Sequence, residues 1–127
     1  MKPPLIGIDL FDPALLADRL DRNPELGKTL FRPGEVEYAQ VQRHPIQHLA
    51  ARFAAKEAVV KALGVLGWDP LDIEVVAGGE DVGLSLHGDM AERASELGVE
   101  VTISMTHLDS LVGAVAMARP KPADRSA

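Results

Sequence analysis

The sequence predicts an α+β fold: a single domain in which an antiparallel sheet packs against a long central helix. Strand-like apolar runs stand at the beginning, in the middle and at the end of the chain, with helical segments between them, and this order favours α+β over a doubly wound sheet. The stretch from Pro45 to Leu63 contains no residue that breaks a helix. A length of 127 residues with 46% apolar content suits one domain with its own core.

The first third of the chain is predicted to hold one strand and three short helices. Leu5–Leu10 is a short apolar run typical of a buried strand. Asp12 suits an N-cap and Pro13 the first helical position, so a helix is expected to run from there to about Arg22. The segments that follow are a short helix from Asn23-Pro24 to about Leu30, a break at Arg32-Pro33-Gly34 and a helix at Glu35–Gln42.

The long helix is expected to end at Gly64, which suits a C-terminal cap. The predicted elements after it are strands at Ile73–Val76 and Val82–His87, a helix at Asp89–Leu97 that stops at Gly98, and a hairpin of Val99–Thr106 with Leu111–Met117. The domain is expected to cover residues 1–119. The polar, Pro-containing tail at residues 120–127 is expected to be disordered.

Composition and charge exclude several classes of protein. Thirteen basic residues against nineteen acidic ones give a net charge of −6, which argues against a general nucleic-acid binder. The absence of cysteine excludes disulfides, thiolate nucleophiles and Cys-ligated metals. The longest apolar stretch, Leu111–Ala118, is far shorter than the roughly 20 residues of a membrane helix, and Met1–Pro4 begins no signal peptide. The sequence therefore predicts a soluble, cytoplasmic protein with no membrane or nucleic-acid partner.

Glu57 falls in the middle of the apolar stripe predicted for the long helix. At about 100° per residue, the apolar residues on its side are Ile46, Leu49, Ala50, Phe53 and Val60, and the basic residues towards the edges are Arg52, Lys56 and Lys61. A carboxylate on an apolar face is costly unless it is paired, protonated or bound to a cation. Two interpretations stand: an ion pair with Lys61 four residues on, or a buried metal ligand with Lys61 beside it as an anion contact.

Asp9, near the end of the first apolar run, offers a similar choice. It either caps the following helix or joins Glu57 in holding a hard divalent cation. Mg²⁺ takes oxygen ligands, usually one or two carboxylates, and completes its shell with water and substrate phosphates. No Gly-rich turn has the spacing of a P-loop or a dinucleotide-binding fingerprint.

Three further basic or histidine positions leave alternatives open. His44 and His48 have a spacing that permits a metal site, although solvation at the helix end is the simpler interpretation. Arg52 is either a cation facing substrate or an interface, or part of a surface salt bridge. His87 stands at a strand end with no role expected. The small residues Ala54, Ala55, Ala58 and Ala62 suggest close packing of the long helix against a neighbour, and that neighbour could be another protomer.

Three segments share their order and spacing with a known family. They are Gly7-Ile8-Asp9-Leu10, the stretch Arg52–Gly64 with Phe53-Ala54-Ala55-Lys56-Glu57-Ala58 followed by Lys61, and Ile103-Ser104-Met105-Thr106-His107. Together they resemble holo-[acyl-carrier-protein] synthase, the small type of 4′-phosphopantetheinyl transferase. Leu30-Phe31 with Glu35 and Tyr38 resembles a weaker pattern of the same family. The resemblance covers nearly the whole chain.

The resemblance implies an enzyme that moves 4′-phosphopantetheine from coenzyme A to a serine of an apo acyl carrier protein and releases 3′,5′-ADP, for fatty-acid or polyketide biosynthesis. It implies Mg²⁺ held by Asp9 and Glu57, both of them catalytic together with Lys61. Glu57, directly or through water, is the candidate proton acceptor. The implied cofactor-binding residues are Lys61, Gly64, Ser104, Thr106 and His107, with His107 near the 3′-phosphate. A homotrimer with sites between protomers is also implied.

The chain departs from the family pattern in places that concern carrier recognition. Leu15 stands where the family usually has an arginine that docks the acidic carrier, and Arg19 with Arg22 are the candidate substitutes. A Gly-x-Pro before the middle strand is replaced by Gly79–Gly83, and the basic stretch before the long helix is reduced to Arg43 and His44. A second hypothesis is therefore a degenerate, catalytically weak relative that binds coenzyme A or a carrier protein without transfer.

Overall fold

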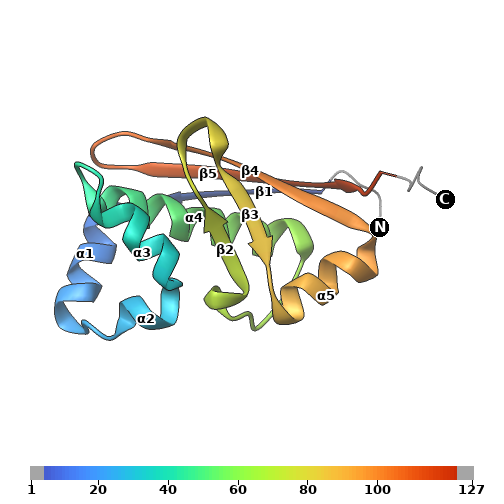
Figure 1. Ribbon diagram of the computed structural model, residues 1–127, viewed down its shortest axis with the longest axis horizontal. Coiled ribbons are helices and arrows are strands. Elements are labelled where there is room, and N and C mark those ends of the chain that lie inside the picture. Colours follow the sequence, from blue (N-terminus) through green and yellow to red (C-terminus); the bar gives the residue numbers. More distant parts are fainter. Residues whose placement is uncertain (1–4, 123–127) are drawn as a thin grey trace.

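The computed structural model describes residues 5–122 and confirms the predicted α+β fold, with two antiparallel sheets arranged around one long helix (Figure 1). The elements in chain order are β1 (Leu5–Phe11), α1 (Pro13–Arg22), α2 (Leu26–Leu30), α3 (Pro33–Gln40), α4 (Pro45–Leu63), η1 (Pro70–Asp72), β2 (Ile73–Val76), η2 (Gly79–Asp81), β3 (Gly83–Leu86), α5 (Gly88–Leu97), β4 (Val99–His107) and β5 (Val112–Pro120).

The larger sheet has the strand order β1-β5-β4, with β5 in the centre. β1 and β4 both pair antiparallel with β5, in registers that place Leu5 opposite Ala118 and Val99 opposite Pro120. Helix α4 packs along one face of this sheet, and the core between them consists mostly of alanines and valines. Small side chains on both sides let the helix and sheet backbones come close together.

Gly7 is the point of closest approach between β1 and α4. A Cβ atom at this position would clash with the backbone oxygen of Ala58 and lie 2.8 Å from the backbone nitrogen of Ala62. Because both obstacles are backbone atoms, only glycine fits unless the strand moves. This contact fixes β1 on the helix two residues before Asp9.

The other face of the larger sheet is apolar and carries no covering element among residues 5–122. Side chains alternate along β1, and the three that point away from α4 are strongly exposed: Ile6 by 61%, Ile8 by 60% and Leu10 by 64%. Val115 and Met117 of β5 stand beside them, each 38% exposed. We call these five side chains the outer sheet face.

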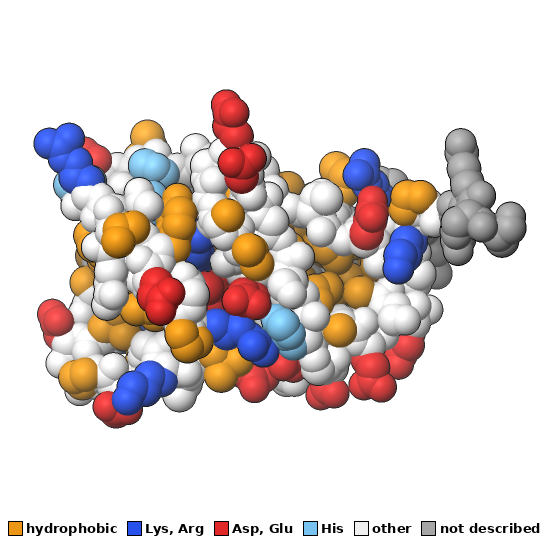
Figure 2. All heavy atoms as spheres, viewed as in Figure 1, with side chains coloured by type: hydrophobic (Ala, Val, Ile, Leu, Met, Phe, Trp, Pro, Cys, Tyr) orange, Lys and Arg blue, Asp and Glu red, His pale blue; other side chains and the backbone are white. Residues whose placement is uncertain are grey.

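The remaining elements surround α4 on its other sides. Helices α1, α2 and α3 gather at one end, the β2–β3 hairpin crosses α4 in the middle, and α5 lies at the far end (Figure 1). Acidic side chains gather along α5 and at the tip of the β2–β3 hairpin (Figure 2). No helix in the described part of the chain is both long and apolar enough to cross a membrane.

Most predicted boundaries hold within two residues, and the differences have local causes. Helix α3 begins at Pro33 and not at Glu35, because proline occupies the first helical turn, where its missing N–H is not needed. The last strand extends to Pro120 and is continued by a hydrogen bond from the Lys121 N–H to the Gly98 oxygen. The tail predicted to be disordered covers residues 120–127; the structure corrects its start, because Pro120 belongs to β5, and residues 123–127 lie outside the described residues.

The predicted close packing of the α4 alanines against a neighbour is confirmed, and that neighbour is not another protomer. The alanines of α4 pack against β1 and β5 of the same chain, so they are not a surface for a second protomer. Ala54, Ala55 and Ala58 are completely buried within the single chain. The surface left for a neighbour is the outer sheet face.

Candidate functional site

The structure brings Asp9, Glu57 and Lys61 together at the junction of β1 and α4, as predicted. The Lys61 ammonium donates to Asp9 Oδ1 at 3.1 Å and to the backbone oxygen of Ile8 at 3.0 Å. The Asp9 side chain is 16% exposed and that of Lys61 is 53% exposed, so the pair lies at the rim of the core. The sequence analysis offers an i,i+4 ion pair between Glu57 and Lys61 as one interpretation. In the structure Lys61 pairs with Asp9 instead.

Glu57 is a half-buried carboxylate with a like charge beside it. Burial raises its pKa from the usual value of 4.5, the neighbouring Asp9 raises it further, and Lys61 partly opposes the change. The Asp9 carboxylate therefore disfavours ionisation of Glu57, and a cation bound by both carboxylates would favour it. No group of three His, Asp or Glu side chains able to hold a metal occurs within residues 5–122, so a cation here would depend on these two carboxylates plus non-protein ligands.

Gly64 ends α4 as predicted, one turn beyond Lys61. It adopts the left-handed conformation with φ of 65°, and its N–H donates to the Val60 oxygen at 2.9 Å. No atom lies within 4 Å of where a Cβ would stand, so the surface here is open. The cluster of Asp9, Glu57 and Lys61 thus borders an open helix end.

A second polar site lies on a different side of α4 and is built around Arg52. Its side chain is 1% exposed, donates to the backbone oxygen of Ala77, and stacks with its guanidinium carbon 4.1 Å from the centre of the Tyr38 ring. Its Nε is shielded from solvent and has no hydrogen-bond partner among the described residues. Burial lowers the pKa of Arg52, and Glu35 and Tyr38 partly oppose this. A buried guanidinium with a free donor is suited to an anion.

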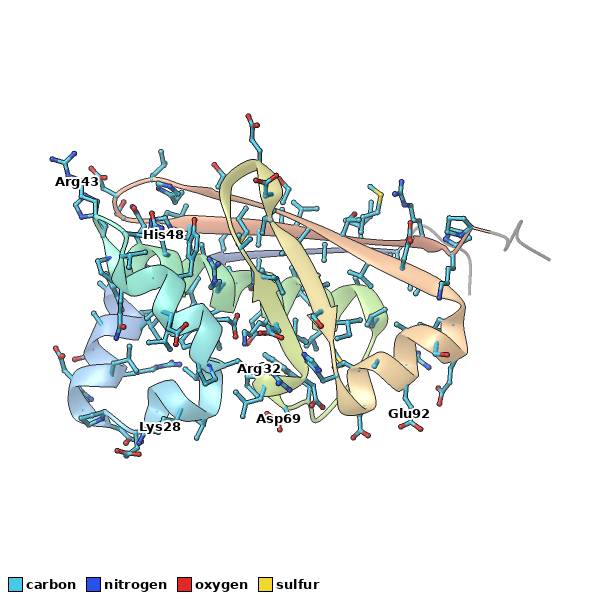
Figure 3. All side chains as sticks on the ribbon, viewed as in Figure 1. Lys28, Arg32, Arg43, His48, Asp69 and Glu92 are labelled. Carbon is cyan, nitrogen blue, oxygen red and sulfur yellow. The ribbon has the colours of Figure 1, made fainter. Side chains whose placement is uncertain are left out.

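Two histidines complete the wall of this pocket. His48 lies on α4 between α3 and the β4–β5 hairpin (Figure 3), with its ring centre 5.8 Å from that of Tyr38 and 6.0 Å from that of His107. Burial lowers the pKa of His48, and the positive charges of His107, Arg52 and His44 lower it further. The cavity measures about 450 Å³. Arg52, His48 and His107, with Tyr38, are called the anion pocket below.

Lys56 and Glu35 form a fully buried ion pair next to the anion pocket. The Lys56 ammonium donates to Glu35 Oε1 at 2.7 Å, to the Leu30 oxygen at 2.8 Å and to the Pro70 oxygen at 2.9 Å. Glu35 also accepts from the N–H of Arg32 and from that of Val75. Burial lowers the pKa of Lys56, and Glu35 partly restores it. The pair connects α2, α3, α4, η1 and β2.

The predicted cofactor-binding residues do not all lie in one place. His107 and Ser104 line the cavity of the anion pocket. Thr106 lies on the exposed side of β4 together with Ser104, beside Gly113 of the central strand. Lys61 and Gly64 belong to the carboxylate cluster on another side of α4. The cavity lined by His107 includes neither Asp9 nor Glu57.

Helical geometry explains this separation. At about 100° per residue, His48, Arg52 and Lys56 follow one stripe of α4, whereas Glu57 is turned well away from it. The stripe faces α3 and β2, and Glu57 faces β1. A single chain therefore presents two half-sites, one with carboxylates and a lysine, the other with cations and histidines.

Sequence reasoning offered Arg52 as a cation facing substrate or an interface, but it did not predict that Arg52 and Lys56 are buried. A helical wheel placed Arg52 and Lys56 at the edge of the apolar stripe, yet they are 1% and 0% exposed. It also placed Glu57 at the centre of the buried side, whereas the structure leaves it half-buried. The available signal was the four-residue spacing of His44, His48, Arg52 and Lys56, which marks a polar stripe on a helix otherwise rich in alanine.

Two other predictions about histidines are resolved by the structure. His48, assigned by sequence to helix-end solvation, lines the anion pocket. His87, for which no role was expected, places its Nε2 3.0 Å from Glu74 Oε1 between the two strands of the small sheet. This contact lies outside both half-sites.

Comparison with known sequences identifies the family. A family model described as the 4′-phosphopantetheinyl transferase superfamily matches residues 5–113. A holo-[acyl-carrier-protein] synthase of Moorella thermoacetica is 41% identical over 116 residues, which cover 87% of this chain and 90% of the relative. One from Streptomyces griseus is 38% identical over 117 residues, covering 89% and 95%.

Solved structures agree with the sequence comparison. An ACPS–CoA complex of Chronobacterium ammoniagenes matches with a TM-score of 0.81 and 28% identity, covering 95% of this chain and all of the other. The acyl carrier protein synthase of Mycobacterium tuberculosis matches with a TM-score of 0.73 and 33% identity, covering 91% and 96%.

Proposed function

Because the chain belongs to the 4′-phosphopantetheinyl transferase superfamily, in its holo-[acyl-carrier-protein] synthase group, we propose that it transfers 4′-phosphopantetheine from coenzyme A to a serine of an apo acyl carrier protein. The observation that carries the proposal is the meeting of Asp9, Glu57 and Lys61 at one junction of β1 and α4. Binding of coenzyme A is supported by the relative from Chronobacterium ammoniagenes, whose structure is described as a complex with it.

Asp9 and Glu57 fit a magnesium ion. Two neighbouring carboxylates, one of them with a raised pKa, repel each other when both are ionised and gain from a shared divalent cation. Glu57 is half-buried, and the end of α4 at Gly64, next to the cluster, is open. When bound, the ion would neutralise charge on the diphosphate of coenzyme A.

The proposed transfer is a phosphoryl displacement. The carrier serine oxygen forms a bond to the β-phosphorus of coenzyme A, the bond from that phosphorus to the bridging oxygen breaks, and 3′,5′-ADP leaves with the electron pair. Lys61 offsets the charge that grows on the departing phosphate. Glu57, directly or through a water molecule, is the proposed acceptor of the serine proton.

The anion pocket is proposed to hold the 3′-phosphate end of coenzyme A. Arg52 offers a buried donor without a partner, and His48 and His107 border the same cavity of about 450 Å³. A phosphate bound here would receive charge-assisted hydrogen bonds in a place shielded from water.

The two half-sites support an assembly in which active sites lie between protomers. The outer sheet face provides an apolar surface beside Asp9, and Ser104 and Thr106 lie on that same side of the sheet. A neighbour docked there would bring its anion pocket towards the carboxylates of the first chain. We propose a homotrimer, as the family resemblance implies, with a cytoplasmic location and a carrier of fatty-acid or polyketide biosynthesis.

The decisive experiment combines the protein with coenzyme A, Mg²⁺ and an apo acyl carrier protein, and follows the carrier by mass spectrometry. We expect the mass of the phosphopantetheine arm to appear on the carrier with the wild type, and not with Asp9→Ala or Glu57→Ala. Glu92→Ala, which removes an exposed carboxylate on α5, is the matched control and should retain transfer. Binding of coenzyme A without any mass gain would favour the degenerate relative instead.

A further inference from the structure

Helices α3 and α4 meet along two matched layers of polar side chains. In the first layer Glu35 of α3 faces Lys56 of α4, and in the second Tyr38 of α3 faces Arg52 of α4. The layers are one helical turn apart on both helices, because 35 and 38 differ by three and 52 and 56 by four. The first layer is sealed in the core and the second opens to the anion pocket.

The two layers contain two buried cations and one buried carboxylate. Lys56 and Glu35 both have side chains with 0% exposure, and Arg52 is 1% exposed. Glu35 already attracts Arg52, because its charge favours the protonated guanidinium. One carboxylate cannot neutralise both cations. The more the charge of Glu35 is balanced by Lys56, the more positive charge remains on Arg52 in the pocket.

Contacts assign Glu35 to Lys56. Glu35 Oε1 accepts from the Lys56 ammonium at 2.7 Å and from the Arg32 N–H at 3.0 Å, and Oε2 accepts from the Val75 N–H at 3.2 Å. Both carboxylate oxygens are thereby occupied. Arg52 is left with the Ala77 oxygen and the Tyr38 ring, neither of which carries a full negative charge, and with a free Nε.

We propose that Lys56 is a positioning residue that keeps Glu35 from neutralising Arg52, so that the guanidinium stays available for a phosphate monoester in the anion pocket. The inference rests on the proposed function in that the phosphate is one carried by coenzyme A. Lys56 acts through Arg52 and touches no substrate. The chain thus uses a buried ion pair to leave the second buried cation without a counter-ion until ligand binds.

The test measures binding of 3′,5′-ADP by isothermal titration calorimetry, with folding checked by thermal melts of each variant. Lys56→Met removes the cation that Glu35 contacts and leaves the Glu35 charge to act on Arg52, so affinity should fall by at least about tenfold. Glu35→Gln together with Lys56→Met removes both charges of the first layer and should bring affinity back to within about threefold of wild type. A triple variant that adds Arg52→Met should lose binding again.

The double variant keeps the proposal falsifiable even if Lys56→Met alone does not fold. Replacing both members of a buried pair is usually tolerated, whereas removing one is not. If the folded double variant binds 3′,5′-ADP as weakly as the triple variant, Lys56 contacts the anion itself and the proposal is wrong. A folded Lys56→Met with wild-type affinity would also overturn it.

Two controls separate this inference from the proposed function. Arg119→Met removes one cation from an exposed ion pair at the end of β5 and should leave binding unchanged, which excludes a general effect of net charge. Wild-type protein that binds 3′,5′-ADP but transfers nothing to a carrier would contradict the proposed function while the variant series still decides the role of Lys56. Wild-type protein that binds no 3′,5′-ADP would overturn both.

Discussion

Lys56 and Glu57 are adjacent in the sequence and have opposite electrostatic surroundings. Lys56 is sealed in the core, where three acceptors satisfy its ammonium. Glu57 is half-buried; burial raises its pKa, and the Asp9 carboxylate raises it further. Burial also lowers the pKa of Lys56, but there the neighbouring carboxylate, Glu35, partly restores it. Perturbed pKa values of the kind seen for Glu57 are common at functional sites.

Glu57→Gln should stabilise the metal-free protein. The pKa of Glu57 is raised in the fold, so the native state holds this proton more tightly than the unfolded chain, and stability falls as pH rises above the usual value of 4.5. Glutamine removes this penalty, and we expect a melting temperature about 2–4 °C higher at neutral pH. Thermal melts across the acid-to-neutral range should show a smaller decline with pH for the variant.

Added Mg²⁺ should reverse the order of the two proteins. A ligand that binds only the native state raises the melting temperature, so the ion should raise that of the wild type and have little effect on Glu57→Gln. Glu92→Gln, an exposed change on α5, is the control and should behave as wild type in both conditions. An equal response of wild type and Glu57→Gln to Mg²⁺ would rule out Glu57 as a ligand.

The candidate site divides into a part that the sequence can predict and a part that it cannot. Asp9, Glu57 and Lys61 are predictable because each is a charge on an otherwise apolar element, and their motifs match a family. The stacking of Arg52 on Tyr38 is not, since it depends on how α3 packs on α4. Periodicity treats every arginine as a surface residue, and that holds unless tertiary partners such as the Ala77 oxygen are supplied.

At the scale of elements, helix α4 is predicted at both ends because its limits are set locally, by Pro45 at the start and Gly64 in the left-handed conformation at the end. Strand β3 is shorter than predicted, at Gly83–Leu86 and not Val82–His87. Its length is set by pairing with the four residues of β2, which no pattern within β3 itself reveals. The sequence of a single element does not show which distant segments contact it, and those contacts set where the element ends.

Gly7→Val should damage the fold and the metal site together. The new side chain would meet the backbone of Ala58 and Ala62, so β1 must move away from α4. Overpacking against backbone costs about 1–3 kcal/mol or more, and we expect the melting temperature to fall by at least about 5 °C. Because β1 carries Asp9, stabilisation by Mg²⁺ should be lost even where the variant is folded.

Gly83→Ala is the matched control for this change. A Cβ at Gly83 meets no atom within 4 Å, and its backbone needs no left-handed conformation. Its stability should stay within about 0.5 kcal/mol of wild type, with the response to Mg²⁺ intact. Were Gly7→Val to keep the full Mg²⁺ response, the position of β1 would not be what brings Asp9 to Glu57.

At the scale of the whole molecule, the outer sheet face is the surface suited to the proposed partner protomer. Ile6, Ile8 and Leu10 lie side by side on an edge strand, each at least 60% exposed, and a contiguous apolar patch on a sheet is typical of an interface. Ile8 sits in the middle of it, opposite Val115 of the central strand. An interface here would also bring the anion pocket of one chain towards the carboxylates of its neighbour, which the proposed transfer needs.

Ile8→Lys should therefore convert the assembly into monomers and abolish transfer, since a charge would be buried between copies. Sedimentation velocity at micromolar concentration should show a trimer for the wild type and a monomer for the variant. Val41→Lys tests the same substitution at a position that is 82% exposed on the loop after α3, away from the sheet, and should leave the assembly intact. A monomeric wild type would contradict the proposal that active sites lie between protomers.

Carrier recognition is the other property that belongs to the whole molecule, because this protein has a net charge of −6 and the proposed carrier presents an acidic helix. Long-range repulsion has to be overcome by a local positive patch. Helix α1 offers Arg19 and Arg22 on its exposed side, beside Leu15, which is 50% exposed. Arg22 is partly compensated by Asp18, whose carboxylate lies 3.4 Å away in an exposed pair of little strength.

Reversing both charges, with Arg19→Glu and Arg22→Glu, should raise the KM for the carrier by about tenfold or more at low salt and change the KM for coenzyme A by less than about twofold. Asp18→Asn frees Arg22 and should move the carrier KM in the opposite direction. Screening should shrink both effects at higher ionic strength, because the charges are exposed. Steady-state kinetics at two salt concentrations measure all of this. A carrier KM that ignores these changes would place docking elsewhere than α1, since two added negative charges at a contact surface must weaken the approach of an acidic helix.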